Sequence, residues 1–479
     1  MTVSFRCILI SSLAFCCSVG QSQERDSQRW IKLSTPKCEL YTDTNSTTAR
    51  EILSLFETAE SATLRPGDQA RRETQGRLRV IAFANEAEYA PFRLNAAALG
   101  HYLHARDRDY IVLAGADPEH FQAAVHEYTH YSANRAGYHL PLWLNEGIAD
   151  LYSTTATKTG HPVLGGPLSG RLSTLNAIRL LPLNDLFAVG RGLSLYTEPE
   201  KAALFYSESW ALTHLLAMDG RYAGRFPELL NELSAGRSTT DVLWSIYRRT
   251  PEEFEAELPA YIRHMQEGRP VVGISEMQVE PGQATVAEFE RRVLWADLLV
   301  AHPATAARAK DQLLELKKEF PEQPEPDELL GHLAWDAKHS EEAQRHWGKA
   351  IEHGSLDFET LYRHALHLHA AGGPSSVVIA LMEKAVSAKP GSDEAVYNLG
   401  VLKYEEGQYE AASQTLLRLQ KIAPERAYTY YSVLAYCDIK MKAFDGAKAF
   451  LLKAAESART PEQQAENSRM LRFAAARAD

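Results

Sequence analysis

The chain has 479 residues, of which 45% are hydrophobic, 24% charged and 9% aromatic. This length predicts about three structural units, and the composition excludes a disulfide-held mini-protein, a disordered chain and a collagen-like chain. The chain has 51 Lys and Arg and 62 Asp and Glu, so its formal net charge is -11. Because the sequence also has no long basic stripe that could neutralise phosphates, we expect no nucleic-acid partner.

The beginning of the chain is typical of a secretory signal peptide. Residues 1–20 contain one positive charge, at Arg6, and an apolar stretch at 7–19 that ends before a polar run. This stretch is shorter than the roughly 20 residues that span a membrane, and no later segment has ~18 uninterrupted apolar residues. We therefore expect an exported chain without stable membrane insertion after signal removal. Cys16 stands where a lipoprotein cysteine could, but the bulky Phe15 before it disfavours a lipid anchor.

Two cysteines follow the signal segment, Cys38 and Cys437. They are too few for a disulfide framework; an oxidising compartment would permit one bridge, but two separate buried thiols are the expected state. Neither is expected to act as a nucleophile, because Cys38 lies in a predicted strand and Cys437 in a predicted repeat helix.

The segment after the signal predicts an α+β domain. Runs of apolar and β-branched residues predict the strands of a small mixed sheet at 30–33, 38–42, 78–84 and 110–114. Apolar residues at helical spacing, together with residues typical of the first and last turns of helices, predict helices at 49–62, 118–136, 142–152, 202–218, 226–233 and 251–265. Loops are expected at 65–76 and, near the site, at 154–170, which is rich in Gly, Thr and Pro.

The C-terminal part contains an internal repeat with a period of 34 or 35 residues. Its register starts at Gly331, Leu366, Gly400 and Ala435, with Ala343, Val378, Ala412 and Ala447 twelve residues on, and Ala350, Ala385, Leu419 and Ala454 nineteen on. These residues resemble tetratricopeptide repeats, in which small side chains let two antiparallel helices pack closely. The copy at 392–424 is the best match, Leu366 and Val378 depart from the usual small residues, and a weaker copy around 294–321 extends the array upstream. The resemblance implies a groove that binds a protein partner.

The motif His-Glu-x-x-His occurs at residues 126–130. On a helix, positions four apart share one face, so His126 and His130 can reach one metal ion, and Glu127 lies near enough to take a proton from water. Glu146 follows sixteen residues later in a second predicted helix and is the candidate third ligand. Asp150, one turn beyond Glu146, is the candidate to orient a histidine ring by a hydrogen bond.

Together these residues resemble the gluzincin metallopeptidases, the class that includes thermolysin, and within it the peptidase MA-like branch. Three stretches carry the resemblance: HEYTH at 126–130, LPLWLNEGIADLY at 140–152 and FYSESWALTHLL at 205–216. The resemblance covers roughly residues 30–265. It implies a zincin-like domain in the periplasm or extracellular space that hydrolyses a peptide or protein substrate.

The same resemblance implies the roles of the residues. His126, His130 and Glu146 would ligate one Zn²⁺ ion, Glu127 would act as general base and then acid, and Asp150 would orient a ligand.

The resemblance also implies that Tyr206, near the start of a helix, stabilises the oxyanion; Ser207 or His214 could equally face the site. Two alternatives to a peptidase stay open. One is a catalytically inactive metalloprotease-like adaptor whose repeats mediate protein–protein interaction. The other is hydrolysis of a non-peptide amide, such as that of a cell-wall fragment.

The expected fold is therefore an α+β zincin-like metallopeptidase domain (small mixed sheet plus helices) followed by an all-α tetratricopeptide-repeat solenoid. The expected division is a signal peptide at 1–20, a metallopeptidase-like domain at 21–270, a helical linker or degenerate repeat at 271–325, and repeats at 326–479. The expected function is that of an exported zinc metallopeptidase whose repeat groove binds a protein partner or substrate.

Overall fold

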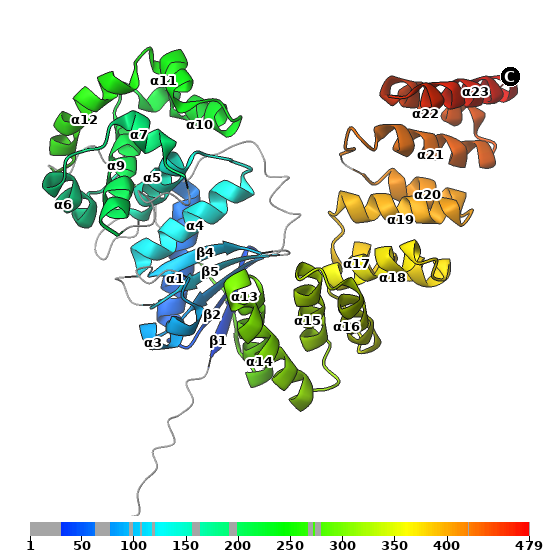
Figure 1. The fold of residues 1–479 in the computed structure, drawn as a ribbon, viewed down its shortest axis with the longest axis horizontal. Helices are drawn as coiled ribbons and strands as arrows, with labels where there is room; N and C mark the ends of the chain where they lie inside the picture. Colours follow the sequence, from blue (N-terminus) through cyan, green and yellow to red (C-terminus); the bar gives the residue numbers. More distant parts are fainter. Residues whose placement is uncertain are drawn as a thin grey trace, which may run out of the picture.

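The computed structural model describes residues 30–62, 77–94, 99–105, 108–116, 120–155, 163–190, 199–266, 272–273, 279–419 and 421–478. The expected signal peptide and the loop expected at 65–76 lie outside these residues. Figure 1 shows a sheet with helices on both faces, a lobe of helices at one end of it, and a row of stacked helix pairs that runs to the C terminus.

A six-stranded mixed sheet has the order β4-β5-β3-β2-β1-β8. The strands are β1 (Ile31–Ser34), β2 (Cys38–Thr42), β3 (Leu78–Ala82), β4 (Gly100–His104), β5 (Asp109–Leu113) and β8 (Gly282–Thr285). β2, β3 and β5 run parallel, whereas β1, β4 and β8 each pair antiparallel with a neighbour. The four predicted strands are confirmed as β1, β2, β3 and β5, and the two edge strands were not predicted.

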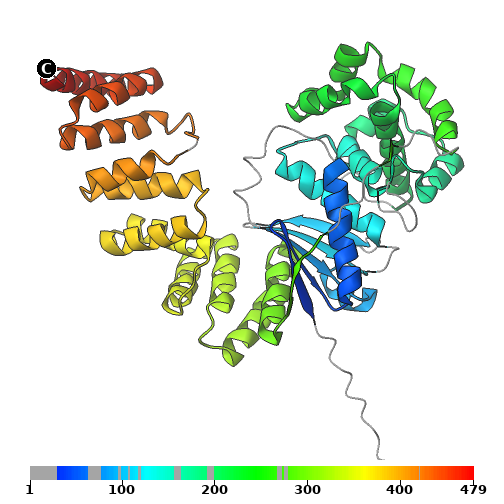
Figure 2. The same ribbon diagram turned by 180° about the vertical axis from the view of Figure 1, so that it is seen from behind.

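Alternating side chains of the central strands enter two separate cores. Leu40, Val80 and Ile111 face α1 (Ser46–Ala62) and α4 (Phe121–Arg135). Their neighbours Tyr41, Ile81 and Val112 face α13 (Glu288–Val300) and α14 (Ala306–Glu319) on the other side. Figure 2 shows α1 lying across its face of the sheet. Residues 282–300, which we expected in a helical linker or degenerate repeat, thus supply an edge strand and a covering helix to this sheet.

A lobe of helices follows α4 and packs around one apolar core that includes Trp143, Trp210 and Phe254. Its helices are α5 (Leu142–Ser153), α6 (Ser169–Ala177), α7 (Leu183–Ala188), α9 (Pro199–Met218), α10 (Phe226–Ser234), α11 (Thr239–Tyr247) and α12 (Pro251–Gln266). The predicted helices α5, α9, α10 and α12 are confirmed; α6, α7 and α11 were not predicted. Within the expected loop at 154–170, β6 (Val163–Leu164) pairs with β7 (Val272–Gly273).

The remaining helices stack as antiparallel pairs. They are α15 (Glu325–Asp336), α16 (Ser340–Glu352), α17 (Phe358–Ala370), α18 (Ser375–Ala388), α19 (Asp393–Glu405), α20 (Tyr409–Leu416), α21 (Ala427–Lys440), α22 (Phe444–Ser457) and α23 (Pro461–Ala478). A Cβ atom at Gly331 would lie 2.3 Å from the Trp347 ring, and one at Gly400 would lie 2.5 Å from Leu416. The small residues of the repeat register therefore mark the closest approach of paired helices, as predicted.

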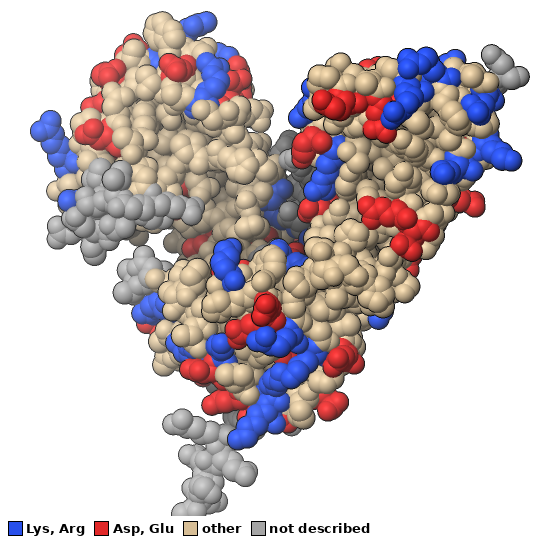
Figure 3. Space-filling view, turned by 45° about the vertical axis from the view of Figure 1, so that its right-hand side comes forward, with Lys and Arg blue, Asp and Glu red and all other residues tan. Residues whose placement is uncertain are grey.

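Short elements complete the described chain: α3 (Glu86–Tyr89), η1 (Ala90–Phe92), η2 (Ala223–Arg225) and η3 (Pro303–Thr305). Cys38 and Cys437 are both buried and unbridged, as predicted. Within the described ranges, no helix combines the length and apolar character needed to cross a bilayer. Figure 3 shows acidic and basic side chains interspersed over one face, with a hollow between the helical lobe and the last repeats.

Candidate metal centre

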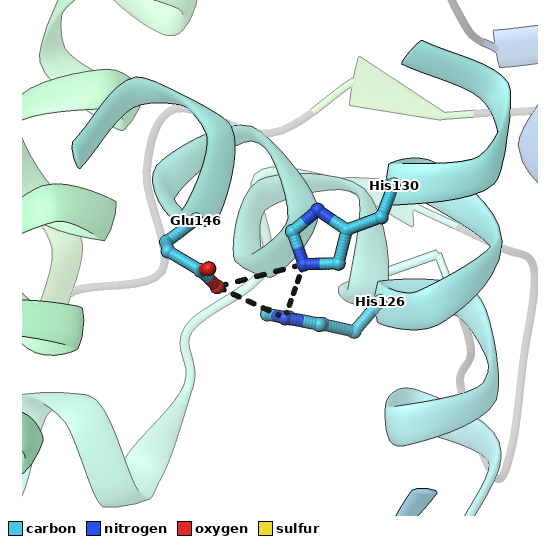
Figure 4. Close-up of side chains that lie close together, drawn as sticks. All are labelled: His126, His130 and Glu146. Atoms are coloured by element: carbon cyan, nitrogen blue, oxygen red, sulfur yellow. Dashed lines mark hydrogen bonds and ion pairs between the residues drawn. The ribbon is translucent and has the colours of Figure 1, made fainter. Parts of the chain in front are cut away.

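Three predicted ligands meet where α4 and α5 face one another (Figure 4). His126 and His130 lie one turn apart on α4, and their Nε2 atoms are 3.1 Å apart. The Glu146 Oε2 atom on α5 lies 3.4 Å from Nε2 of His126 and 3.5 Å from Nε2 of His130. Among the residues the structure describes, this is the one group of three or more His, Cys, Asp or Glu close enough to hold a metal ion.

The geometry of the three donors fits zinc. Zinc–ligand distances of about 2.0–2.2 Å in a tetrahedron place any two donor atoms about 3.3–3.6 Å apart. The observed separations of 3.1, 3.4 and 3.5 Å lie close to those edges. Two imidazoles and one carboxylate also form a common donor set for catalytic zinc, which leaves the fourth position open.

Packing fixes the position of Glu146. The next residue, Gly147, lies where α5 crosses α9, and a Cβ there would be 2.1 Å from Oγ1 of Thr213 and 2.4 Å from the Ser209 carbonyl oxygen. Only glycine allows this close approach, which holds the first half of α5 between α4 and α9. The side chain of Glu146 is consequently 6% exposed.

The charges around the site call for a cation. Burial disfavours the charged form of His126, but hydrogen bonds to Asp150 and Glu146 outweigh that effect and raise its pKa to about 10. Burial likewise opposes ionisation of Glu146, yet His130 and His126 hold the pKa of this carboxyl well below its usual range. Protonated His126 and Arg171 balance the two buried carboxylates of Glu146 and Asp150, and a bound metal ion would supply part of this positive charge with both histidines neutral.

Asp150 contacts His126. Its Oδ1 lies 2.9 Å from Nδ1 of His126, which accordingly carries the proton and turns the lone pair of Nε2 toward His130 and Glu146. The next member of this hydrogen-bonded chain was not predicted from the sequence. Arg171 of α6 donates from Nε to Asp150 Oδ2 at 2.7 Å and from Nη2 to Oδ1 at 3.2 Å. Its guanidinium carbon lies 5.0 Å from the ring centre of Tyr206.

Glu127 is held by the edge strand of the sheet. The backbone N–H of Tyr102 in β4 donates to its Oε2 at 2.7 Å. In an antiparallel pair alternate residues turn their N–H groups away from the partner strand, and Tyr102 is one of these. The Tyr102 hydroxyl donates to Asp109 at 2.8 Å and accepts from Asn134 of α4 at 2.9 Å, which ties β4 to the helix that carries the histidines.

The third stretch of the resemblance lies beside this centre. Tyr206 of α9 packs under Arg171, so the structure joins it to His126 through Arg171 and Asp150; its expected oxyanion role stays a prediction. Ser207 donates to the Ala203 carbonyl at 2.7 Å. His214 uses both ring nitrogens inside the lobe, with Tyr261 and with the Gly165 carbonyl, and burial lowers its pKa to about 4. The hydrogen bonds of Ser207 and His214 therefore run to groups other than the three clustered donors.

Comparison with known proteins bears on the repeats. A family model described as tetratricopeptide repeat matches residues 378–431, and no curated protein matches the chain. The crystal structure of YrrB, a TPR protein with an unusual peptide-binding site, matches at 15% identity and a TM-score of 0.30, covering 37% of this chain and 90% of that chain. A crystal structure of MamA matches at 16% identity and a TM-score of 0.26, covering 38% and 98%. The family model and the stacked helix pairs identify tetratricopeptide repeats in the C-terminal part of the chain.

Proposed function

We propose that this protein is an exported, zinc-dependent metallopeptidase of the gluzincin type, acting in the periplasm or extracellular space, whose repeats bind a protein partner or substrate. The observation that carries the proposal is the set of three donor atoms 3.1–3.5 Å apart with Glu127 on the same helix turn as His126. His126, His130 and Glu146 would hold the ion. Zinc, when bound, supplies Lewis-acid activation of water and of the scissile carbonyl group.

The residues of the chain supply the remaining chemistry. Glu127 takes a proton from the attacking water and returns it to the leaving amine. The N–H of Tyr102 occupies its Oε2, which fixes the plane of the carboxylate and leaves Oε1 to exchange the proton. Asp150 and Arg171 keep the His126 ring in one orientation and one tautomer.

The edge strand gives the proposal a route for substrate. β4 ends the sheet order, so an extended polypeptide could add alongside it through the outward main-chain groups other than the Tyr102 N–H, which Glu127 occupies. Because Tyr102 of this strand contacts Glu127, a polypeptide bound there passes close to the general base. Tyr206 is the side chain proposed to stabilise the oxyanion.

A second candidate function is that of an adaptor that binds metal without turnover. Two observations favour it: the family match lies wholly within the repeats, and one oxygen of Glu127 is already engaged by a backbone amide. In this case the repeats mediate protein–protein interaction and the metal centre stabilises the fold.

Hydrolysis of casein by the purified chain separates the two functions. The metallopeptidase proposal predicts cleavage that stops with phenanthroline and returns with zinc. Glu127→Gln should keep its zinc and lose about 10²–10⁴-fold in rate, since it removes general acid–base catalysis. Glu51→Gln, at an exposed position of α1, is the matched control and should cleave normally. A zinc-loaded wild type without cleavage of any unfolded protein would favour the adaptor, and a fully active Glu127→Gln would refute the assigned base.

A further inference from the structure

The last repeats contain a small cavity between α21 and α23. It measures about 140 Å³ and is lined by side chains of α19, α21, α22 and α23. Drug-sized ligands occupy roughly 300–1,000 Å³, whereas a cavity of about 150 Å³ holds a single benzene ring. The cavity therefore has room for the end of one side chain.

Aromatic rings and one carboxylate form the walls. Tyr404 and Tyr436 contribute rings whose centres are 6.2 Å apart, and Tyr428 contributes a third. Glu466 lies among them, and its Oε1 accepts a hydrogen bond from the Tyr436 hydroxyl at 2.9 Å. Burial and the nearby carboxylate raise the pKa of Tyr436 to about 12, so this hydroxyl stays protonated and donates. The side chain of Glu466 is 47% exposed, which leaves its other oxygen accessible.

In earlier repeats of the solenoid, Lys and Arg side chains of the chain itself lie over aromatic rings. Arg426 at the start of α21 lies 5.1 Å from the ring centre of Tyr397 and 3.1 Å from Oε1 of Glu394, both on α19. One repeat before, Lys389 lies over Phe358 at 4.9 Å, and Arg363 of α17 lies over Trp335 of α15 at 5.2 Å. At each of these steps the chain places its own cation on an aromatic ring.

The rings that line the cavity differ from these. Among the described residues, no Lys or Arg lies over the ring of Tyr404, Tyr428 or Tyr436, whereas the neighbouring rings of Tyr409 and Tyr431 have Lys440 and Lys453 at 5.8 and 5.7 Å. The position equivalent to Arg426, 34 or 35 residues on, is Thr460 or Pro461. Arg469, whose side chain is 71% exposed, forms an ion pair with Glu466 Oε1 at 3.8 Å without a hydrogen bond.

We propose that this cavity binds a basic side chain, arginine in preference to lysine, from an extended segment of a second polypeptide. Its guanidinium stacks on the tyrosine rings and donates to the free oxygen of Glu466, while its methylene stem covers the apolar residues Leu451 and Met470. Arginine is preferred because its planar guanidinium group stacks on aromatic rings and can donate two hydrogen bonds to one carboxylate. The inference deepens the proposed protein-binding role of the repeats and is independent of the metal centre.

The test measures fluorescence anisotropy of nine-residue peptide pools with the full chain, in phenanthroline so that no peptide is cleaved. The pools share random flanks without Lys or Arg and differ at the centre: arginine, lysine, citrulline or glutamate. Citrulline keeps the shape of arginine and removes its charge. We expect the arginine pool to bind about tenfold more tightly than the citrulline pool, because citrulline keeps the stacking and the donors but loses the charge that strengthens the ring contact and the hydrogen bond.

Substitutions of Glu466 test whether the preference for arginine arises in this cavity. Glu466→Gln should remove most of the preference for arginine, and Glu466→Lys should abolish binding of the arginine pool. Glu410→Gln, at an exposed position of α20, is the matched control and should bind as wild type. Equal binding of the arginine and citrulline pools, or an unchanged preference in Glu466→Gln, would overturn the cavity assignment alone. Failure of every pool to bind would overturn it together with the peptide-binding role proposed for the repeats.

Discussion

Arg171 provides the sharpest prediction about the candidate metal centre, because it contacts none of the three candidate ligands and reaches His126 only through Asp150. The Asp150 side chain is 5% exposed and accepts two hydrogen bonds from the guanidinium and one from His126. Arg171→Met removes two of these three bonds and leaves a buried carboxylate with one partner. Loss of a residue that supports a ligand typically weakens metal binding about 10–100-fold. Since Arg171 is 29% exposed and His126 still restrains Asp150, we expect the lower end, about tenfold.

A double-mutant cycle on zinc affinity, measured by competition with a chromophoric chelator, tests this reasoning. Asp150→Asn alone should weaken binding about 10–100-fold. The double variant should bind like Asp150→Asn alone, because Arg171 has no other path to the ligands. Arg179→Met, at an exposed position, is the control and should bind as wild type. Effects that multiply in the double variant, or a full-affinity Arg171→Met, would refute the relay from Arg171 through Asp150 to His126.

Two further predictions concern stability, measured by urea unfolding. Gly331→Ala should lower the free energy of unfolding by about 1–3 kcal/mol, because its Cβ would lie 2.3 Å from Trp347. Gly348→Ala, whose Cβ would have its nearest contact at 3.7 Å, should be neutral or stabilising, and equal effects of the two substitutions would contradict the repeat packing. Burial lowers the pKa of His214 to about 4, so the unfolded chain binds more protons below pH 6.5 and stability falls as pH drops from 6.5 toward 4. Relative to His214→Leu, the wild type should lose roughly 2 kcal/mol between pH 7 and pH 5, and equal losses would contradict a neutral buried imidazole.

The cluster of candidate metal ligands was predictable because its signal is local. Helical spacing alone puts His126 and His130 on one face, and Glu146 and Asp150 share a second short helix. Arg171 and Tyr102 were not predictable. Each reaches the site from an element whose position depends on the fold, and Tyr102 contributes only a backbone N–H, which any residue but proline carries.

The same distinction holds for the fold. The central strands have apolar side chains on both faces and were predicted, whereas β4 and β8 are edge strands with few buried residues. The amphipathic pattern of α13 fits both a helix of a degenerate repeat and a helix that covers a sheet. Tertiary packing gives it both roles, because Leu294 and Leu298 lie against the strands while Ala296 packs with α14 and α15.

Metal content of the purified mature chain tests the central claim most directly, since it needs no assumption about substrate. After dialysis, elemental analysis should find about one zinc per wild-type chain and none in His126→Ala or Glu146→Ala. His139→Ala, at an exposed position just beyond α4, is the matched control and should keep its zinc. A wild type without bound metal, or His126→Ala with an undiminished zinc content, would contradict the account of this site.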